Sequence, residues 1–266
     1  MVVRKGRDIM STFIPNASTD LTGQVALVTG ATSGLGWNFA QVLASAGAHV
    51  AVAGRRQDRL DEIVEKIENQ GGIARAYILD TSDMAAIETC VERITHEMGI
   101  ISILINNAGI PDAAMATKIS LDLIDQVIDV NLKGPFVLAR EIAKRLIKAE
   151  LPGRIVNISS IAAFDYEGNG AALYSITKAG IARMTEALAV EWSKFNINVN
   201  AIAPGAFSSE MLDGMLERVG DISKHFPRKR LGKPSQLDST LLYLCAPSSE
   251  CVTGTVVKVD DGQMGR

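Results

Sequence analysis

Val25-Ala-Leu-Val-Thr-Gly-Ala-Thr-Ser-Gly-Leu-Gly36 is the stretch that decides the fold of this chain. Its apolar first residues indicate a buried strand, and the residues from Gly34 indicate the start of a helix. Glycines let the backbone turn sharply and approach a pyrophosphate closely, because no Cβ intervenes. The N-terminus of a helix adds free N–H groups and a positive dipole end. The stretch therefore predicts a phosphate cradle for a dinucleotide, made of Gly30, Thr32, Ser33, Gly34, Leu35 and Gly36.

The glycine spacing leaves a second interpretation open. Gly-x3-Gly-x-Gly differs from the common Gly-x-Gly-x-x-Gly, and an ordinary turn between strand and helix uses glycines as well. Its place after the first strand favours the cradle.

Outward from this stretch, short β-branched runs alternate with longer segments of helical periodicity. In the segment 58–67, for example, Leu60, Ile63, Val64 and Ile67 share one helix face. The strands are apolar almost throughout, as in parallel sheets that helices cover on both faces. We expect an α/β fold, a Rossmann-type doubly wound parallel sheet of about seven strands in one domain. The expected strands are Val25–Val28, His49–Ala53, Ala74–Leu79, Ile101–Ile105, Arg154–Ile158, Ile197–Ile202 and Thr255–Val259.

No linker, repeat or low-complexity tract divides the 266 residues. Residues 1–21 are polar and lack an apolar signal region, so we expect a flexible leader followed by one catalytic domain over residues 22–266. The bulky Trp37 at a helix start indicates surface or interface packing rather than a functional role.

Composition excludes several classes of function. A formal charge of −3 gives no basic excess for nucleic acid, and no apolar run reaches the roughly 20 residues that span a membrane. The short run 228–230, Arg-Lys-Arg, is expected to be solvated surface. Three scattered cysteines, Cys90, Cys245 and Cys251, offer neither a disulfide framework nor the spacing of a metal site, so no metal and a reducing cytoplasm are expected.

The end of the second expected strand bears on the choice of cofactor. NAD-binding proteins usually place a carboxylate there for the ribose hydroxyls, but this chain has Gly54 followed by Arg55 and Arg56. A guanidinium can bind a 2′-phosphate through charge-assisted hydrogen bonds. The sequence thus favours NADP(H), while NAD(H) stays open, because both arginines could be surface charges and Ser33 adds no second basic residue.

A Tyr-x3-Lys pair supplies candidate chemistry. Tyr174 and Lys178 lie four residues apart, and therefore on one helix face, after a strand that ends near Ser160. The ordinary pKa of tyrosine, about 10, is too high for efficient proton transfer at neutral pH, and a nearby ammonium lowers it. Ser160 can hydrogen-bond a substrate oxygen as its charge changes. Alone, such a pair is more often a solvated helix pair.

Together these motifs resemble the short-chain dehydrogenase/reductase family, from about Thr22 to Gly262. The resemblance implies hydride transfer between a nicotinamide and a carbonyl or alcohol carbon. The residues that carry it are Thr29-Gly-x3-Gly-x-Gly36, Asp80, Asn106-Asn-Ala-Gly109, Asn131, Ser160, Tyr174-x3-Lys178, Pro204-Gly205 and Val252-Thr-Gly254.

The resemblance also implies a role for each catalytic position. Tyr174 would be the general acid in reduction and the base in oxidation, and Lys178 would bind the nicotinamide ribose. Ser160 would orient the substrate oxygen, with the adjacent Ser159 as a fallback. Asn131 would hold a water of the proton relay beneath Lys178.

For the cofactor, the resemblance implies contacts at three further places. Asp80 and Thr81 would meet the adenine. Asn107, Ala108 and Gly109 would lie along the cofactor, with Asn107 also supporting the sheet. The backbone after Pro204-Gly205, around Phe207, would receive the carboxamide.

Residues 206–230 correspond to the family's variable substrate lid. Their apolar spacing indicates an amphipathic helix over an apolar pocket, or equally a surface helix packing on its own domain. Phe207 and Met211 would contact the substrate from this side, with Phe164 and Tyr166 as the opposite wall.

Three functions remain in view. The first is an NADPH-dependent reductase of 3-oxoacyl groups or small ketones, and the second is an NAD-dependent alcohol or sugar dehydrogenase. The third is a dinucleotide sensor without catalysis, which the retained Tyr174 and Lys178 disfavour. The resemblance further implies a homotetramer that meets through the helix Ala171–Phe195 and the segment Val252–Gly262.

Overall fold

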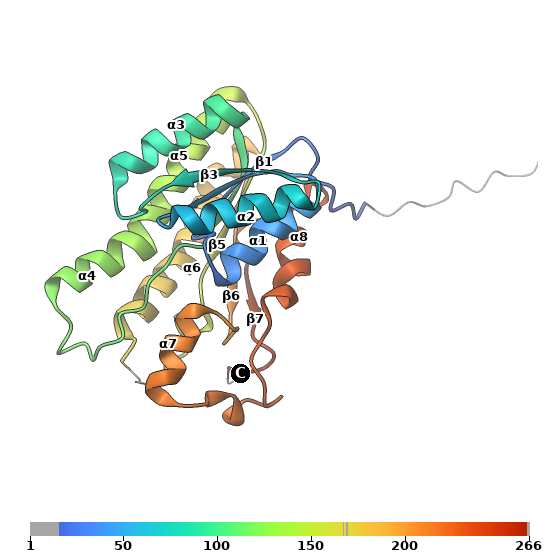
Figure 1. Ribbon diagram of the computed structural model, residues 1–266. Helices are drawn as coiled ribbons and strands as arrows, with labels where there is room; N and C mark the ends of the chain where they lie inside the picture. Colours follow the sequence, from blue (N-terminus) through green and yellow to red (C-terminus); the bar gives the residue numbers. More distant parts are fainter. Residues whose placement is uncertain (1–15, 167, 169, 265–266) are drawn as a thin grey trace, which may run out of the picture.

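Seven parallel strands form one sheet in the order β3-β2-β1-β4-β5-β6-β7, as the computed structural model shows for residues 16–166, 168 and 170–264 (Figure 1). The prediction of a Rossmann-type parallel sheet is confirmed, and every expected strand is present within two residues of its predicted bounds. The strands are β1 Val25–Thr29, β2 His49–Gly54, β3 Ile73–Ile78, β4 Ile101–Asn106, β5 Gly153–Ile158, β6 Ile197–Pro204 and β7 Val256–Val259.

Helices cover both faces of this sheet (Figure 1). One buried cluster joins the sheet to α1, α2 and α8, and a second joins it to α3, α5 and α6. This two-sided cover explains why the strands are apolar throughout rather than alternating. The helices are α1 Gly34–Ser45, α2 Gln57–Asn69, α3 Met84–Met98, α5 Gly134–Ala149, α6 Ala172–Trp192 and α8 Asp238–Cys245.

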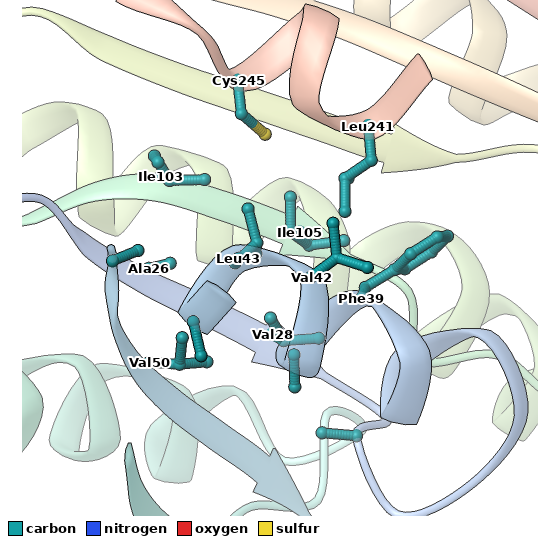
Figure 2. Close-up of a cluster of buried hydrophobic side chains, with 14 of the residues drawn as sticks. Ala26, Val28, Phe39, Val42, Leu43, Val50, Ile103, Ile105, Leu241 and Cys245 are labelled. Carbon is teal, nitrogen blue, oxygen red and sulfur yellow. The ribbon is translucent and has the colours of Figure 1, made fainter. Parts of the chain in front are cut away.

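The first cluster centres on α1. Figure 2 shows Phe39, Val42 and Leu43 of α1 facing the strand residues Val28 and Ile105, with side chains from α8 beyond them. Phe39 and Leu43 are fully buried. This packing fixes the position of α1, and with it the turn that precedes α1.

Strand β1 marks the point where the chain changes direction in the sheet. It pairs with β2 on one side and with β4 on the other, because the chain first runs out to β3 and then returns. In such sheets a crevice opens beyond the carboxyl ends of the two strands at this point, where ligands bind.

Further helices lie at the same edge of the sheet. Helix α4, Leu121–Ile128, continues into a π-helix, Asp129–Lys133, which leads directly into α5. Helix α7, Glu210–Val219, follows β6. The side chain of Gln263 accepts a hydrogen bond from the backbone nitrogen of Ala206 at 2.6 Å, which joins the C-terminal segment to the start of the α7 region.

The predicted leader, residues 1–21, ends one residue too late. Leu21 is fully buried and its nitrogen donates to the carbonyl oxygen of Ala46 at 2.8 Å, so it belongs to the folded domain. Residues 16–20 are exposed, and residues 1–15 lie outside the described residues.

Trp37 packs within the chain. The guanidinium of Arg59 lies 4.7 Å from the centre of its ring, and the ammonium of Lys66 lies 5.9 Å from it. Both cations come from α2, so Trp37 joins α1 to α2, and a cation over an indole ring is a favourable contact.

Candidate active site

A groove of about 790 Å³ opens at the carboxyl ends of the central strands. It begins at the glycine turn after β1, passes the loop after β4 and ends between the segment after β5 and α7. The predicted catalytic and cofactor residues that line it are Gly30, Thr32, Ser33, Gly34, Leu35, Arg55, Arg56, Asp80, Thr81, Asn107, Ala108, Gly109, Ser160, Tyr174, Lys178, Pro204, Gly205 and Phe207. Gly36 and Asn131 lie behind its walls.

The glycine turn has the geometry of a phosphate cradle. Gly30 and Gly34 have φ angles of 65° and 55°, in the left-handed region that favours glycine. A Cβ on Gly36 would lie 2.3 Å from the carbonyl oxygen of Gly30, so glycine lets α1 pack against the turn. Ser33 precedes α1 and makes no side-chain cap, whereas Asp83 caps α3. The first-turn N–H groups of α1 are thus available to an anionic ligand.

Asn107 joins the loop after β4 to the end of β1. Its backbone nitrogen donates to Oγ1 of Thr29 at 3.1 Å, and its side-chain Nδ2 donates to the carbonyl oxygens of Thr29 at 3.0 Å and Gly30 at 3.2 Å. The nitrogen of Ala108 shares Thr29 Oγ1, also at 3.1 Å. Asn107 therefore makes the supporting contacts that the sequence predicts. Its contact with a cofactor stays a prediction.

The end of β2 has no room for a carboxylate side chain. A Cβ on Gly54 would lie 2.7 Å from Cγ2 of Thr32. Arg55 follows, with its side chain 60 % exposed and 3.9 Å from the carboxylate of Asp80. Arg56 turns toward the glycine turn, where it donates to Oγ1 of Thr32 at 2.9 Å. This end of the groove therefore presents guanidinium groups beside the phosphate cradle.

Ser160, Tyr174 and Lys178 come together between the end of β5 and the first turns of α6. The side chain of Ser160 hydrogen-bonds with the phenol of Tyr174. The ammonium of Lys178 lies 5.5 Å from the centre of the Tyr174 ring. The adjacent Ser159 is buried and donates to the carbonyl oxygen of Lys178 at 2.8 Å. Ser160, rather than Ser159, therefore faces the phenol.

The electrostatics of this group differ from the expectation. Burial raises the pKa of Tyr174 above its ordinary value, the carboxylate of Asp112 raises it further, and the hydrogen bond with Ser160 opposes the rise. Burial also lowers the pKa of Lys178 to about 8. The predicted lowering of the phenol's pKa by Lys178 is not found, because the ammonium donates to the carbonyl oxygen of Ile158 at 2.8 Å and both groups lose hydration.

Asn131 lies one layer behind the groove and is 1 % exposed. Its Nδ2 donates to the carbonyl oxygen of Ile110, and its Oδ1 accepts from the nitrogen of Ile110, both at 2.8 Å. A Cβ on Gly109 would lie 3.5 Å from both Asn131 Oδ1 and the Lys178 ammonium. Asn131 is thus placed beside Lys178. The water that the family resemblance implies stays a prediction.

The end of the groove beyond Tyr174, called the substrate end below, is mainly apolar. Tyr166 and Met211 line it as expected, whereas Phe164 is not among the lining residues, and its contact with the substrate stays a prediction. Its ring lies instead against Lys258 of the edge strand β7, with the ammonium 4.3 Å from the ring centre. Other lining residues are Pro111, Ala113, Ile161, Ala162, Asp165, Ala171, Phe207, Leu212, Ile222, Phe226 and Met264.

Sequence reasoning missed polar residues that organise the groove. Asp112 binds the first turn of α6, and Gln263 binds the backbone of Ala206. Glu210, in the first turn of α7, forms an ion pair with Arg56 at 3.1 Å. Each contact joins segments that are distant in sequence, so no local pattern could have indicated it.

The basic run 228–230 is exposed as predicted, but it is also paired. Asp261 binds Arg228 at 3.0 Å and Arg230 at 2.7 Å. These contacts hold the end of the segment 206–230 to the C-terminal segment.

The sequence profile of the short chain dehydrogenase family matches residues 24–219. The chain belongs to the short-chain dehydrogenase/reductase family. It is accordingly an NAD(P)-dependent oxidoreductase that acts on CH–OH groups.

The chain is similar to two kinds of relative, 3-oxoacyl reductases and sugar-acid dehydrogenases. The 3-oxoacyl-[acyl-carrier-protein] reductase FabG of Thermotoga maritima is 35 % identical over 243 residues, 91 % of this chain and 98 % of the relative. The 2-dehydro-3-deoxy-D-gluconate 5-dehydrogenase of Dickeya dadantii is 34 % identical over 250 residues, 93 % and 98 % of the two chains. The crystal structure of a gluconate 5-dehydrogenase from Burkholderia cenocepacia, in complex with NADP and tartrate, has a TM-score of 0.87 at 27 % identity and covers 93 % and 98 % of the two chains.

Within residues 16–166, 168 and 170–264, no helix is long and apolar enough to cross a membrane. The same residues bring no three His, Cys, Asp or Glu side chains together as a metal ion would require.

Proposed function

We propose that this enzyme uses NADP(H) to reduce the carbonyl group of a neutral, largely apolar substrate, such as a 3-oxoacyl group or a small ketone. The lining of the substrate end carries this proposal. Among the described residues that line it, no Lys, Arg or His side chain is present to bind a carboxylate. A sugar acid would leave its charge unpaired there, whereas an acyl chain or a ketone would bury apolar surface.

The catalytic residues suit the proposed step. Bound along the groove, the reduced nicotinamide supplies the hydride to the carbonyl carbon. Tyr174 donates its phenolic proton to the carbonyl oxygen, and Ser160 hydrogen-bonds this oxygen while negative charge develops on it. The C=O bond thus becomes C–OH and Tyr174 is left as a phenolate. The phenolate then regains a proton from solvent, and the Lys178 ammonium, 5.5 Å from the centre of the Tyr174 ring, is placed to bind the nicotinamide ribose.

The end of β2 supports NADP(H) as the cofactor. Gly54 and Thr32 leave no space for the carboxylate that would bind ribose hydroxyls and repel a 2′-phosphate. Arg55 and Arg56 line the groove beside the phosphate cradle and carry the positive charge that a phosphate requires.

An NAD-dependent alcohol or sugar dehydrogenase is the second candidate. Two observations favour it. Relatives of about the same identity are sugar-acid dehydrogenases. The carboxylate of Asp80 lies 3.9 Å from Arg55, where it partly offsets the charge offered to a 2′-phosphate.

Initial rates with NADPH and NADH separate the two candidates. The substrate panel holds small ketones, a 3-oxoacyl thioester and keto sugar acids. We expect turnover of the neutral substrates and a large preference for NADPH. Turnover restricted to the sugar acids would refute the substrate proposal, and a preference for NADH would refute the role of the arginines. Binding of NADPH without any turnover would support the non-catalytic sensor.

Tyr174→Phe tests the acid. Turnover should fall at least about 100-fold while NADPH binding is kept, because only the proton donor is removed. Tyr243→Phe, the same change at a half-exposed position on α8, is the matched control. Substantial residual turnover would identify another acid, with Tyr166, a second phenol that lines the groove, as the candidate.

The remaining proposals concern assembly and surroundings. We propose that residues 206–230 act as the substrate lid and that the enzyme is a homotetramer. An apolar groove between α5 and α6, lined by Leu132, Phe136, Met184 and Leu188, supports the tetramer, which light scattering tests. The free thiols support a reducing cytoplasm.

A further inference from the structure

Asp112 is a buried carboxylate that the proposed reaction does not use. It lies in the loop after β4 and is 3 % exposed. Its Oδ2 accepts from the backbone nitrogens of Leu173 at 2.9 Å and Tyr174 at 3.3 Å, and its Oδ1 accepts from the nitrogen of Ala113 at 3.0 Å. Every one of these partners is a donor, which is the pattern that a charged carboxylate requires.

These contacts supply the N-terminal cap of the catalytic helix. Helix α6 starts after Ala171, whose side chain cannot accept a hydrogen bond, so its first-turn N–H groups need another partner. Asp112 provides it from 61 residues earlier in the chain. The loop is held in the left-handed region at Ala113, with a φ angle of 47°. Such strain at a residue other than glycine persists only where surrounding contacts fix it.

The carboxylate also acts on the phenol through its charge. Lys178 faces the Tyr174 ring from the same helix and Ser160 hydrogen-bonds with the phenol from the end of β5, whereas Asp112, in the loop after β4, binds the backbone nitrogen of Tyr174. Asp165 and Tyr166 line the groove from the segment after β5. The other charged residues of the lining, Arg55, Arg56, Asp80 and Glu210, lie toward the phosphate cradle.

The balance of these groups favours the neutral phenol. The negative charge of Asp112 and the burial of the ring both raise the pKa of Tyr174. The opposing ammonium is held by Ile158, and burial lowers its own pKa to about 8. A protonated phenol is the form that a reductase needs, because it must donate a proton, whereas oxidation of an alcohol needs the phenolate.

We propose that Asp112 is a positioning residue that fixes the first turn of α6 and whose buried charge opposes ionisation of the Tyr174 phenol, so that alcohol oxidation requires a higher pH than it would without this carboxylate. This inference rests on the proposed function, in which Tyr174 is the proton donor.

The test is the pH profile of kcat/KM for oxidation of the alcohol that the best ketone substrate yields. Asp112→Asn and Asp112→Ser both remove the charge but keep an oxygen that can cap the helix. We expect the alkaline midpoint of oxidation to move about one pH unit lower in both variants, as expected for a unit charge several ångströms away in a partly buried site. The decline of ketone reduction at high pH should begin about one pH unit earlier as well.

Two further variants separate charge from capping. Asp112→Glu keeps the charge and should leave the midpoint where it is in the wild type. Asp122→Asn makes the same change as Asp112→Asn at an exposed site on α4, and it should also leave the midpoint at its wild-type value. If either neutral variant is folded and its midpoint coincides with that of the wild type, the inference is overturned, since a merely structural cap would not move this midpoint.

The inference and the proposed function fail in different ways. If Tyr174→Phe keeps the activity, the proposed function is wrong and the inference falls with it. If Tyr174→Phe is inactive and the neutral variants leave the midpoint unchanged, the inference alone fails. If neither neutral variant folds, an ultraviolet difference titration of Asp112→Glu and wild type against Tyr174→Phe decides. Coincident phenol midpoints, both well above 10, support the inference, and a midpoint at or below 10 overturns it.

Discussion

Replacing Lys178 with methionine should remove a pH-dependent cost of folding together with most of the activity. The Lys178 side chain is 4 % exposed, and burial lowers its pKa from 10.5 to about 8. At 1.36 kcal/mol per pH unit, this difference costs the folded state about 3 kcal/mol where the lysine is charged in both states. Methionine cannot donate to the carbonyl oxygen of Ile158, and that loss costs about 1–3 kcal/mol. The removed cost of the buried charge and the loss of this hydrogen bond nearly cancel at neutral pH. The test is therefore the pH dependence of the free energy of unfolding.

The sign follows from the two pKa values. Above about pH 8 the folded protein releases the Lys178 proton, but the unfolded chain holds it up to about 10.5. The unfolded state therefore binds more protons in this window, and the wild type gains stability from Lys178 as the pH rises. Between about pH 7 and about pH 9.5 the gain is about 2 kcal/mol, and the variant lacks it.

Other buried groups act in the opposite direction. Burial raises the pKa of Cys90 to about 11, of Cys245 to about 12 and of Tyr77 to about 12, from ordinary values of 9.0 and 10.0. Their contribution to stability is lost as the pH rises above about 9. Because both proteins contain these groups, their effect cancels when the variant is subtracted from the wild type.

The assay is urea unfolding of both proteins at about pH 7 and about pH 9.5. The free energy of unfolding of the variant, relative to the wild type, should fall by about 2 kcal/mol between the two pH values. Lys148→Met, an exposed position on α5, should show a constant difference within about 0.5 kcal/mol. If the difference in free energy of unfolding between Lys178→Met and the wild type were the same at both pH values, the buried ammonium of Lys178 would not destabilise the folded state.

Further predictions concern the turn, the core and the lid. Gly36→Ala should lower the Tm and weaken NADPH binding at least about tenfold, because its Cβ would meet a backbone carbonyl oxygen at 2.3 Å; unchanged calorimetry and binding would contradict this close packing. Leu43→Ala should cost about 2–5 kcal/mol in urea unfolding, whereas Leu121→Ala, at a site 78 % exposed, should change the free energy by less than about 0.5 kcal/mol. Glu210→Gln should tighten NADPH binding up to about fivefold in fluorescence titrations, because it frees the half-exposed Arg56 from an ion pair worth at most about 1 kcal/mol; weaker binding would show that the pair orders the site.

The strands and the phosphate turn could be predicted because their signals are local. A strand buried on both faces is a short apolar run, and the turn is a fixed spacing of glycines, so neither depends on distant partners. The same holds for α2, where the expected face of Leu60, Ile63 and Ile67 is buried.

What escaped prediction depends on contacts between distant segments. Asp112 has no helix of its own to cap, and its partner is a helix that starts far along the chain. The raised pKa of Tyr174 comes from burial in a groove that exists only after folding. The place of Phe164 in the chain indicated the substrate pocket. Nothing local in the sequence indicated its contact with Lys258 on the edge strand.

The π-helix Asp129–Lys133 lies within reach of both ends of the groove. Asn131 binds Ile110 beside the catalytic group, and Gly134, the first residue after the π-helix, packs so closely that its Cβ would lie 2.3 Å from the carbonyl oxygen of Thr81. One wide turn of helix is therefore a spacer of fixed length between the loops that follow β3 and β4. Deleting a single residue between Asn131 and Gly134 would restore ordinary α-helical winding and bring these two residues one position closer along the helix. The two contacts could then not both form, and the two loops would lose the common reference that sets their separation.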